Sequence, residues 1–242
     1  MKSVKVVLFD VGNTLLFDDP AAWPRVYRRA EAALWRELHR AGATIRPEIL
    51  YGKPDTLLGH YYALRGTGIV EPGMLHVLVG LLEKQGLALP DASVARALRA
   101  MYAVTQTNWK IERDAPATLR ELERRGFRLG VISNVSDDEN ARELLGKAGL
   151  HKFFETVLTS AAHGRRKPDP GIFQEALNHF EVEPRHAVMI GDSYDADILG
   201  ASAVGLRTIW ITRRSPQAGT PTRVVPDAEV SSLADVPALL EK

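Results

Sequence analysis

The sequence predicts an α/β fold with a doubly wound, mainly parallel sheet, helices on both faces of the sheet, and an inserted all-helical subdomain. Short, almost continuously apolar runs recur along the chain, as expected for strands buried on both faces. From about residue 115 onward these runs alternate with helix-like segments, which is typical of βαβ units. Residues of about 17–112 instead carry long helical patterns and no convincing strand.

The first expected strand is Val4–Phe9, a run rich in β-branched residues that ends at Asp10. Four similar runs are expected to form strands at Leu129–Ile132, Thr156–Leu158, Ala187–Ile190 and Thr208–Ile211. Helix-like segments lie between them at Ala117–Arg125, Glu139–Lys147, Gly171–Phe180 and Asp195–Ala203. A last short helix is expected at Ser231–Leu240.

The insertion after the first strand shows the three- to four-residue spacing of an amphipathic helix. One apolar face is formed by Trp23, Tyr27, Ala30, Leu34 and Leu38. A second stripe is formed by Val94, Leu98 and Met101. We therefore expect a core made of residues 1–16 and 113–242, and a helical insertion made of residues 17–112.

Composition limits the partners and the location of the chain. The net charge of its 242 residues is only +1, and its many arginines are scattered among Glu and Asp, which we interpret as a solvated surface. We therefore expect neither nucleic acid nor a membrane as partner. Cysteine is absent, which excludes disulfides and thiolate chemistry. No signal-peptide pattern and no run of ~18 apolar residues occurs, so we expect an untargeted, cytoplasmic protein.

Polar residues follow the expected strands at four places. Asp10 to Thr14 comes after the first strand, and Ser133-Asn134 after the second. Lys167 lies in a Lys-Pro-Asp-Pro run after the strand at Thr156, and Asp192 comes after the strand at Ala187–Ile190. In an open parallel sheet, ligands bind at the carboxyl ends of the strands. We therefore expect these side chains to form one site.

The residue types at these places suit the transfer of a phosphoryl group. The carboxylates Asp10 and Asp192 could together hold Mg²⁺, a hard cation that takes oxygen ligands. The cation and Lys167 would neutralise a phosphoryl group, while Ser133 and nearby backbone N–H groups would bind its oxygens. Asp10 would then be an ionised carboxylate able to attack phosphorus. The expected cofactor is Mg²⁺, and the expected substrate is a small phosphorylated molecule.

These four motifs resemble, in their order, the motifs of the haloacid dehalogenase superfamily of hydrolases. The resemblance covers the whole expected core, and the position of the insertion matches that of the family's helical cap. It implies a Rossmann-like core and a cap that closes over the substrate. The matching segments are Phe9-Asp10-Val11-Gly12-Asn13-Thr14, Val131-Ile132-Ser133-Asn134, Lys167-Pro168-Asp169-Pro170 and Gly191-Asp192-Ser193-Tyr194-Asp195-Ala196-Asp197.

The resemblance also implies a role for each matching residue. Asp10 would be the nucleophile that forms an aspartyl intermediate. Ser133 and Lys167 would bind the transferred group. Mg²⁺ would be held by Asp10, by the backbone carbonyl of Gly12 and by Asp192.

Three further residues would have supporting roles under this resemblance. Asp197 would either orient Lys167 or act through a metal-bound water. Thr14 and Asn134 would contribute to substrate binding through loop geometry and hydrogen bonds.

The sequence departs from the family's pattern at Gly12. Phosphatases of this superfamily normally carry a second aspartate there, which protonates the leaving alkoxide and then activates water. Glycine cannot transfer a proton, and general acid–base help contributes roughly 100- to 10,000-fold. Asp18 and Asp19 could supply a carboxylate, but a hinge or helix-cap role is favoured for them.

Three functions stay open at this point. The first is a Mg²⁺-dependent phosphatase with another acid–base group or a good leaving group. The second is a carbon–halogen or carbon–phosphorus hydrolase: the presence of Asp192 argues against a dehalogenase, and a phosphonatase would need a cap lysine, for which Lys53 is the candidate. The third is a binding or regulatory protein with weak turnover. We expect an enzyme, because Asp10, Ser133, Lys167 and Asp192 are all present.

Overall fold

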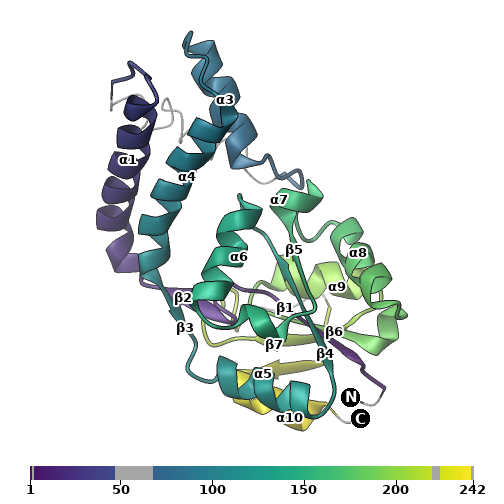
Figure 1. The fold of residues 1–242 in the computed structure, drawn as a ribbon. Coiled ribbons are helices and arrows are strands. Elements are labelled where there is room, and N and C mark those ends of the chain that lie inside the picture. Colours follow the sequence, from purple (N-terminus) through teal and green to yellow (C-terminus); the bar gives the residue numbers. More distant parts are fainter. Residues whose placement is uncertain (2, 47–67, 220–223, 241–242) are drawn as a thin grey trace. The chain divides into compact units, whose positions relative to one another are not determined.

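The computed structural model describes residues 1, 3–46, 68–219 and 224–240. The chain divides into two compact units. The first, Met1–Phe17 with Lys110–Lys242, is called the sheet unit here, and the second, Asp18–Trp109, is called the helical unit (Figure 1). Lys53 lies outside the described residues.

The sheet unit is built on six parallel strands in the order β5-β4-β1-β6-β7-β8. From β1 the chain adds strands outward on one side and then returns to add strands on the other, so the sheet is doubly wound. The predicted α/β class with a parallel sheet is therefore confirmed. The strands are β1 (Val6–Phe9), β4 (Arg128–Ser133), β5 (Thr156–Thr159), β6 (Ala187–Gly191), β7 (Arg207–Ile211) and β8 (Ala228–Val230).

Helices cover both faces of this sheet (Figure 1). Val6 and Leu8 pack in one apolar cluster with Ile172 and Phe173, whereas Phe9 points to the opposite face and meets the ring of Phe154 edge-on. The helices of the sheet unit are α5 (Ala115–Arg124), α6 (Asp138–Lys147), α7 (Ser160–His163), α8 (Pro170–Phe180), α9 (Gly200–Ala203) and α10 (Val236–Leu239). Short helical turns are η4 (His151–Phe153), η5 (Pro184–His186), η6 (Tyr194–Leu199) and η7 (Leu233–Asp235).

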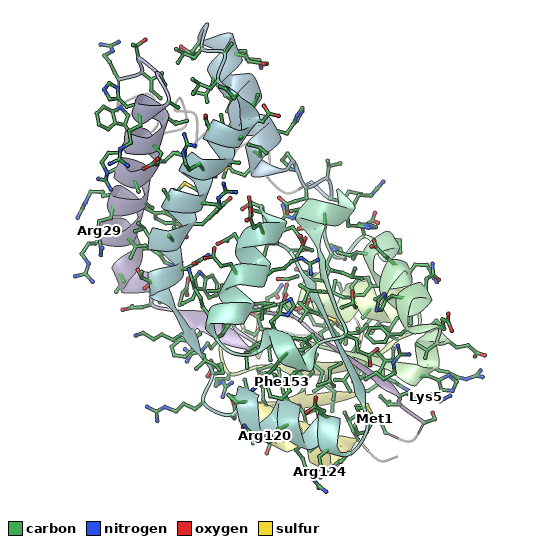
Figure 2. All side chains as sticks on the ribbon, viewed as in Figure 1. Met1, Lys5, Arg29, Arg120, Arg124 and Phe153 are labelled. Atoms are coloured by element: carbon green, nitrogen blue, oxygen red, sulfur yellow. The ribbon has the colours of Figure 1, made fainter. Side chains whose placement is uncertain are left out.

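Amphipathic sequence explains how these helices attach to the sheet. In α5, Leu119 and Leu122 are buried, while Arg120 and Arg124 are exposed on its other side (Figure 2). In α6, Ala141 and Leu145 form the buried side.

The helical unit has its own apolar core, formed between α1 (Trp23–Arg40), α3 (Met74–Lys84) and α4 (Asp91–Thr105). Helices α1 and α4 run side by side (Figure 1). Leu34, Leu38, Val94 and Leu98 are buried there, as their spacing predicts, but Tyr27 of the expected apolar face is exposed. Two short turns, η1 (Pro20–Ala22) and η3 (Gln106–Asn108), flank these helices. None of the described helices is both long enough and apolar enough to cross a lipid bilayer.

Three short strands differ from the prediction. The expectation of no strand in residues 17–112 was wrong at both ends, where β2 (Leu16–Asp18) pairs with β3 (Trp109–Ile111). The third, β8, was not expected at all. Each has three residues, which is too short for a periodic pattern, and β2 finds its partner only across the whole insertion. The C-terminal helix is also shorter than expected, with α10 preceded by the turn η7.

Candidate active site

The carboxyl ends of β4, β1 and β6 bring three predicted site residues together. Asp10 directly follows β1, Ser133 is the last residue of β4, and Asp192 directly follows β6. Because β1 lies between the other two strands, Asp10 is in the middle of this row. Its backbone N–H continues the ladder by donating to Ile190 O at 2.9 Å. The sheet itself therefore fixes the backbone of Asp10.

A buried lysine links Asp10 to the rest of the cluster. Nζ of Lys167 donates to Oδ1 of Asp10 at 2.8 Å, to Oδ1 of Asp197 at 2.6 Å and to the Ile132 carbonyl at 2.6 Å. An ammonium has three N–H donors, so all three are satisfied. Burial alone would lower the pKa of Lys167, but the charges of Asp10 and Asp197 outweigh it and raise that pKa. Lys167 is thus held as a cation although it is buried.

Asn134 holds the backbone of Lys167. Its amide Nδ2 donates to the Lys167 carbonyl at 2.9 Å, and its Oδ1 accepts from the Lys167 N–H at 2.8 Å. Two hydrogen bonds to one residue fix the point from which the lysine side chain starts. Next along the chain, Asp169 caps α8 by accepting from Gly171 N–H at 2.9 Å. The side chain of Asn134 was predicted to bind substrate. In the structure, both its nitrogen and its oxygen form hydrogen bonds with the Lys167 backbone.

Asp197 is almost fully buried, and both of its carboxylate oxygens are engaged. Oδ1 accepts from Lys167, and Oδ2 accepts from the Ser193 N–H at 3.0 Å. Asp197 lies in η6, a π-helical turn of the kind often found at functional sites. Its close approach requires glycine at position 191, because a Cβ there would lie 2.1 Å from Asp197 Oδ2. Gly191 therefore makes room for the carboxylate that orients Lys167.

The cluster carries more acidic groups than basic ones. Asp10, Asp192 and Asp197 place carboxylate oxygens within 4.8 Å of one another. Burial and then the charges of Asp10 and Asp197 raise the pKa of Asp192 to about 7, although Asn13 and Lys167 oppose this. Burial also raises the pKa of Asp197. A divalent cation would offset this excess of negative charge.

The oxygens that are left fit Mg²⁺, which prefers one or two carboxylates and several waters. Oδ2 of Asp10 takes part in no hydrogen bond with any described residue, whereas both oxygens of Asp197 are used. Asp10 and Asp192 are therefore the carboxylates best placed to bind a cation. The hydroxyl of Ser133 likewise has no partner within the described parts of the chain, and it is free to bind a ligand oxygen.

The loop after Asp10 is closed by backbone hydrogen bonds. The Val11 carbonyl accepts from the N–H groups of Leu15 and Leu16, each at 2.9 Å. Gly12 forms an isolated bridge with Leu16. Thr14 lies fully buried in this loop, and its hydroxyl has no partner in the described chain.

Asn13 is a site residue that the sequence reasoning missed. It adopts a φ of 54°, in the left-handed region that Asn enters more readily than most residues. Its side chain forms a hydrogen bond to Asp192, which opposes the rise in the pKa of that carboxyl. The Gly12-Asn13 pair is a turn signal, so the left-handed conformation could have been expected from the sequence. The bond to Asp192 could not, because it depends on the pairing of β1 with β6.

Asp18 and Asp19, the two carboxylates considered as substitutes for the missing acid, have local partners in the helical unit. The indole N–H of Trp23 donates to Oδ2 of Asp18. Asp19 caps η1 by accepting from Ala21 N–H at 3.0 Å. The contact of Asp19 matches the cap role that the sequence favoured, whereas Asp18 contacts a side chain instead of capping a helix.

The chain is similar in sequence and in fold to several known proteins. A bovine (Bos taurus) haloacid dehalogenase-like hydrolase domain-containing protein 3 is 41% identical over 52% of this chain, but that alignment spans only 49% of the bovine protein. A phosphoserine phosphatase of Thermus thermophilus is 32% identical and aligned over 96% of this chain and 98% of its own length. A solved structure of a 2-haloacid dehalogenase from Pseudomonas syringae superposes with a TM-score of 0.67 at 29% identity, covering 98% of this chain and 97% of that one.

The family profile of the haloacid dehalogenase-like hydrolases matches residues 4–205, which include every predicted site residue. The resemblance stated from the motifs is therefore confirmed. The parallel sheet, the row of strand-end residues and the profile agree on one conclusion. This chain belongs to the haloacid dehalogenase-like hydrolases.

Proposed function

We propose that this enzyme is a Mg²⁺-dependent phosphatase that acts on a small phosphorylated metabolite, with Asp10 as nucleophile. The observation that carries the proposal is the contact of the buried Lys167 ammonium with Asp10 at 2.8 Å, beside the second carboxylate Asp192. This arrangement holds one carboxylate oxygen by a cation and leaves the other unbonded. Similarity to a phosphoserine phosphatase over nearly the full length of both chains also supports phosphoryl chemistry.

In the first step, a carboxylate oxygen of Asp10 attacks phosphorus and forms an aspartyl phosphate. The ester bond from phosphorus to the leaving oxygen breaks, and its electron pair goes to the leaving alkoxide, which takes a proton from solvent. Ser133 is proposed to bind an oxygen of the phosphoryl group, and the Lys167 ammonium, which stays bonded to Asp10, is proposed to stabilise the negative charge of that group by its proximity. When bound, Mg²⁺ would supply positive charge at these oxygens and would be held by Asp10, Asp192 and the Gly12 carbonyl.

In the second step, water attacks the same phosphorus atom. The bond from phosphorus to Asp10 breaks, which restores the carboxylate and releases inorganic phosphate. Neither step receives a proton from position 12, because Gly12 has no side chain. The proposed enzyme should therefore be faster on substrates whose leaving group needs no protonation.

A dehalogenase is the second candidate, favoured by the superposition on a 2-haloacid dehalogenase and by the absence of an acid at Gly12. The raised pKa of Asp192, which burial and its acidic neighbours cause, weighs against it. A buried carboxylate in that position is unfavourable unless a cation binds there, and carbon–halogen cleavage by a carboxylate needs none. A phosphonatase would depend on Lys53, which lies outside the described residues.

The helical unit, Asp18–Trp109, is proposed to be the cap that selects the substrate. Its separate apolar core supports this proposal, since a unit with its own core can move as one body. A cytoplasmic location is proposed on the absence of cysteine.

The test is hydrolysis of an activated aryl phosphate and of acetyl phosphate by the wild type and by Asp10→Asn, each with Mg²⁺ or with EDTA. We expect turnover only when both Mg²⁺ and Asp10 are present. Release of halide from a 2-haloacid in EDTA, with no phosphate release in Mg²⁺, would replace this proposal by the dehalogenase. Absence of both activities, in wild type and in Gly12→Asp, would favour a binding role.

A further inference from the structure

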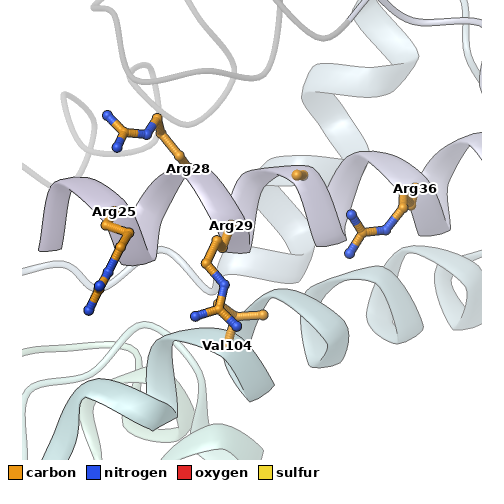
Figure 3. A pocket seen from close by; sticks show the side chains of 6 residues that line it. Arg25, Arg28, Arg29, Arg36 and Val104 are labelled. Carbon is orange, nitrogen blue, oxygen red and sulfur yellow. The ribbon is translucent and has the colours of Figure 1, made fainter. Parts of the chain in front are cut away.

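A group of four arginines gathers on one helix of the helical unit. Arg25, Arg28, Arg29 and Arg36 of α1 line a hollow of about 310 Å³, together with two small apolar residues, Ala32 and Val104. Arg25, Arg29 and Arg36 extend from α1 toward the side on which α4 runs, and Val104 lies beside Arg29 (Figure 3). These four arginines are called the arginine face below.

The arginine face is exposed and has no ion pair among the residues that the structure describes. Several other arginines of the described chain do have a carboxylate partner. Arg40, on the same helix, contacts Glu37, and Arg142 of α6 contacts Asp138 at 2.8 Å. On α5, Arg124 contacts Glu121 at 2.8 Å. The prediction that arginine is interleaved with acidic residues holds for these places but is wrong for the start of α1.

The arrangement is also unfavourable for the helix that carries it. The start of a helix favours anions, yet the first turn of α1 has no acidic residue and contains Arg25. Helix α6 follows the usual rule, with Asp138 and Glu139 in its first turn. Arg25 and Arg29 are also four positions apart, a spacing at which like charges repel. Asp19 caps the turn η1 that leads into α1, but it forms no ion pair with these arginines, so their charges remain available to a ligand.

The spacing of the arginines along the backbone of α1 indicates what the ligand would be. Arg25 and Arg36 are separated by about 16 Å along the helix axis, at ~1.5 Å per residue. A single phosphate could not meet more than part of this row. Arginine suits phosphate in particular, because its planar group donates two parallel hydrogen bonds to two oxygens. A chain of linked phosphates can satisfy several such groups at once.

We propose that the arginine face, made of residues of the helical unit alone, binds a small molecule that carries several linked phosphate groups. The four unpaired guanidinium groups would contact the phosphates, and Ala32 and Val104 would contact any apolar part of the ligand. This inference does not depend on the phosphatase proposal, since the residues involved belong to a different unit.

The direct test is titration calorimetry of tripolyphosphate with the full chain in EDTA, where the sheet-unit site lacks its cation. The test variant is the triple replacement Arg25→Gln, Arg29→Gln and Arg36→Gln. The matched control is Arg40→Gln, because Arg40 is an exposed arginine of the same helix that has a carboxylate partner. We expect at least a tenfold loss of affinity in the triple variant and less than a twofold change in the control. Wild-type affinity should also fall as salt is added.

Two further measurements separate this site from the hydrolytic site and from misfolding. Aryl phosphate turnover by the triple variant should keep the wild-type kcat and KM. Circular dichroism reports whether α1 still folds, and if the triple variant does not fold, the single variant Arg29→Gln should bind tripolyphosphate about threefold more weakly.

Comparing the affinities for ATP and for tripolyphosphate shows whether the ligand is a nucleoside polyphosphate or an inorganic oligophosphate. Tighter binding of ATP supports a nucleoside polyphosphate whose organic part meets Ala32 and Val104, and equal binding supports an inorganic oligophosphate. Wild type that does not bind tripolyphosphate, or a triple variant that binds it as well as wild type, would overturn the proposal. So would a single-stranded oligonucleotide that binds more tightly than tripolyphosphate through the same arginines, because the face would then serve nucleic acid.

Discussion

Lys167 in the sheet unit and the arginine face in the helical unit differ in whether their positive charges have partners inside the protein. In the sheet unit, Lys167 is 3% exposed, and each of its three N–H groups meets an acceptor. In the helical unit, the four arginines of the arginine face are exposed and meet no carboxylate in the described chain. The lysine therefore has all its hydrogen-bond acceptors inside the protein, whereas the four arginines have no carboxylate partner among the described residues.

This difference follows from the burial of the charged groups. A buried cation must be paired, because an unpaired buried charge is far more costly than an exposed one. The pairing around Lys167 therefore fixes one geometry for Asp10 and Asp197. Exposed arginines need no partner to remain in water, so they can stay available for a ligand. Substitutions should change stability in opposite directions at the two places.

The largest effect is expected at Lys167. Lys167→Met would leave Asp10 and Asp197 buried without their cation, which should lower the free energy of unfolding by about 3–5 kcal/mol and abolish turnover. Urea unfolding and aryl phosphate hydrolysis measure the two effects. The control is Lys147→Met on α6, whose exposed ion pair with Glu143 contributes about 0–1 kcal/mol. Equal losses in both variants would contradict the central place of Lys167.

A smaller loss is expected at Gly191. In Gly191→Ala, the new Cβ would clash with Asp197 Oδ2 and must displace the carboxylate that orients Lys167. We expect a loss of about 2–3 kcal/mol and a fall in kcat. Gly146→Ala on α6 is the control: nothing lies within 4 Å of its Cβ, so alanine there should stabilise the helix by about 0.5–1 kcal/mol. Retained kcat in Gly191→Ala would show that Asp197 need not stay in place.

The pH dependence of stability should reveal the unbalanced acidic charge. The pKa of Asp192 is raised to about 7 from an ordinary value of 3.8, so between these values the folded state binds more protons than the unfolded state. Without Mg²⁺, stability should therefore fall as pH rises from 4 to 7. Asp192→Asn should reduce that slope, because the raised pKa of Asp197 still contributes to it, and should stabilise the chain by about 1–2 kcal/mol at pH 7 in EDTA. If urea unfolding gives the same dependence of stability on pH for wild type and for Asp192→Asn, the raised pKa of Asp192 is contradicted.

The smallest effect, with the opposite sign from Lys167, is expected in the arginine face. Arg25→Gln removes an unpaired cation from the start of α1 and should raise the free energy of unfolding by about 0.3–1 kcal/mol. Arg40→Gln, at the end of the same helix, should lower it slightly, because the helix end favours cations and Glu37 loses a partner. Thermal unfolding at low salt shows both changes. Destabilisation by Arg25→Gln would mean that this arginine has a partner within the protein.

Most of the sheet could be predicted because its strands are buried on both faces. Runs such as Ala187–Ile190 are apolar at every position and stand out in the sequence. The short strands β2, β3 and β8 could not be predicted, since their pairing depends on segments far away in the chain. The order of the strands also follows from packing rather than from any local pattern.

For the candidate site, the sequence indicated which residues belong together but not how they contact one another. Position after a strand singled out Asp10, Ser133 and Asp192, and the structure places them at adjacent strand ends. The two hydrogen bonds from Asn134 to the Lys167 backbone have no signal in the sequence, because they depend on the meeting of two loops.

The arginine face shows a different limit. The helical pattern of α1 places Arg25, Arg29 and Arg36 on one side of the helix, and this could have been predicted from the sequence. The net charge of +1 gave no indication of it. Averages over a chain do not show that charges of one sign share one side of a helix.

The most direct test of the central claim is to find where a phosphoryl group becomes attached. The wild type would be mixed with acetyl phosphate and Mg²⁺ and quenched in acid within its first turnover, and the phosphorylated peptide would be mapped by mass spectrometry. We expect phosphate on Asp10 in wild type, and none in Asp10→Asn under the same conditions. Phosphate on another residue, or steady turnover with no trapped aspartyl phosphate, would contradict the assignment of Asp10 as nucleophile.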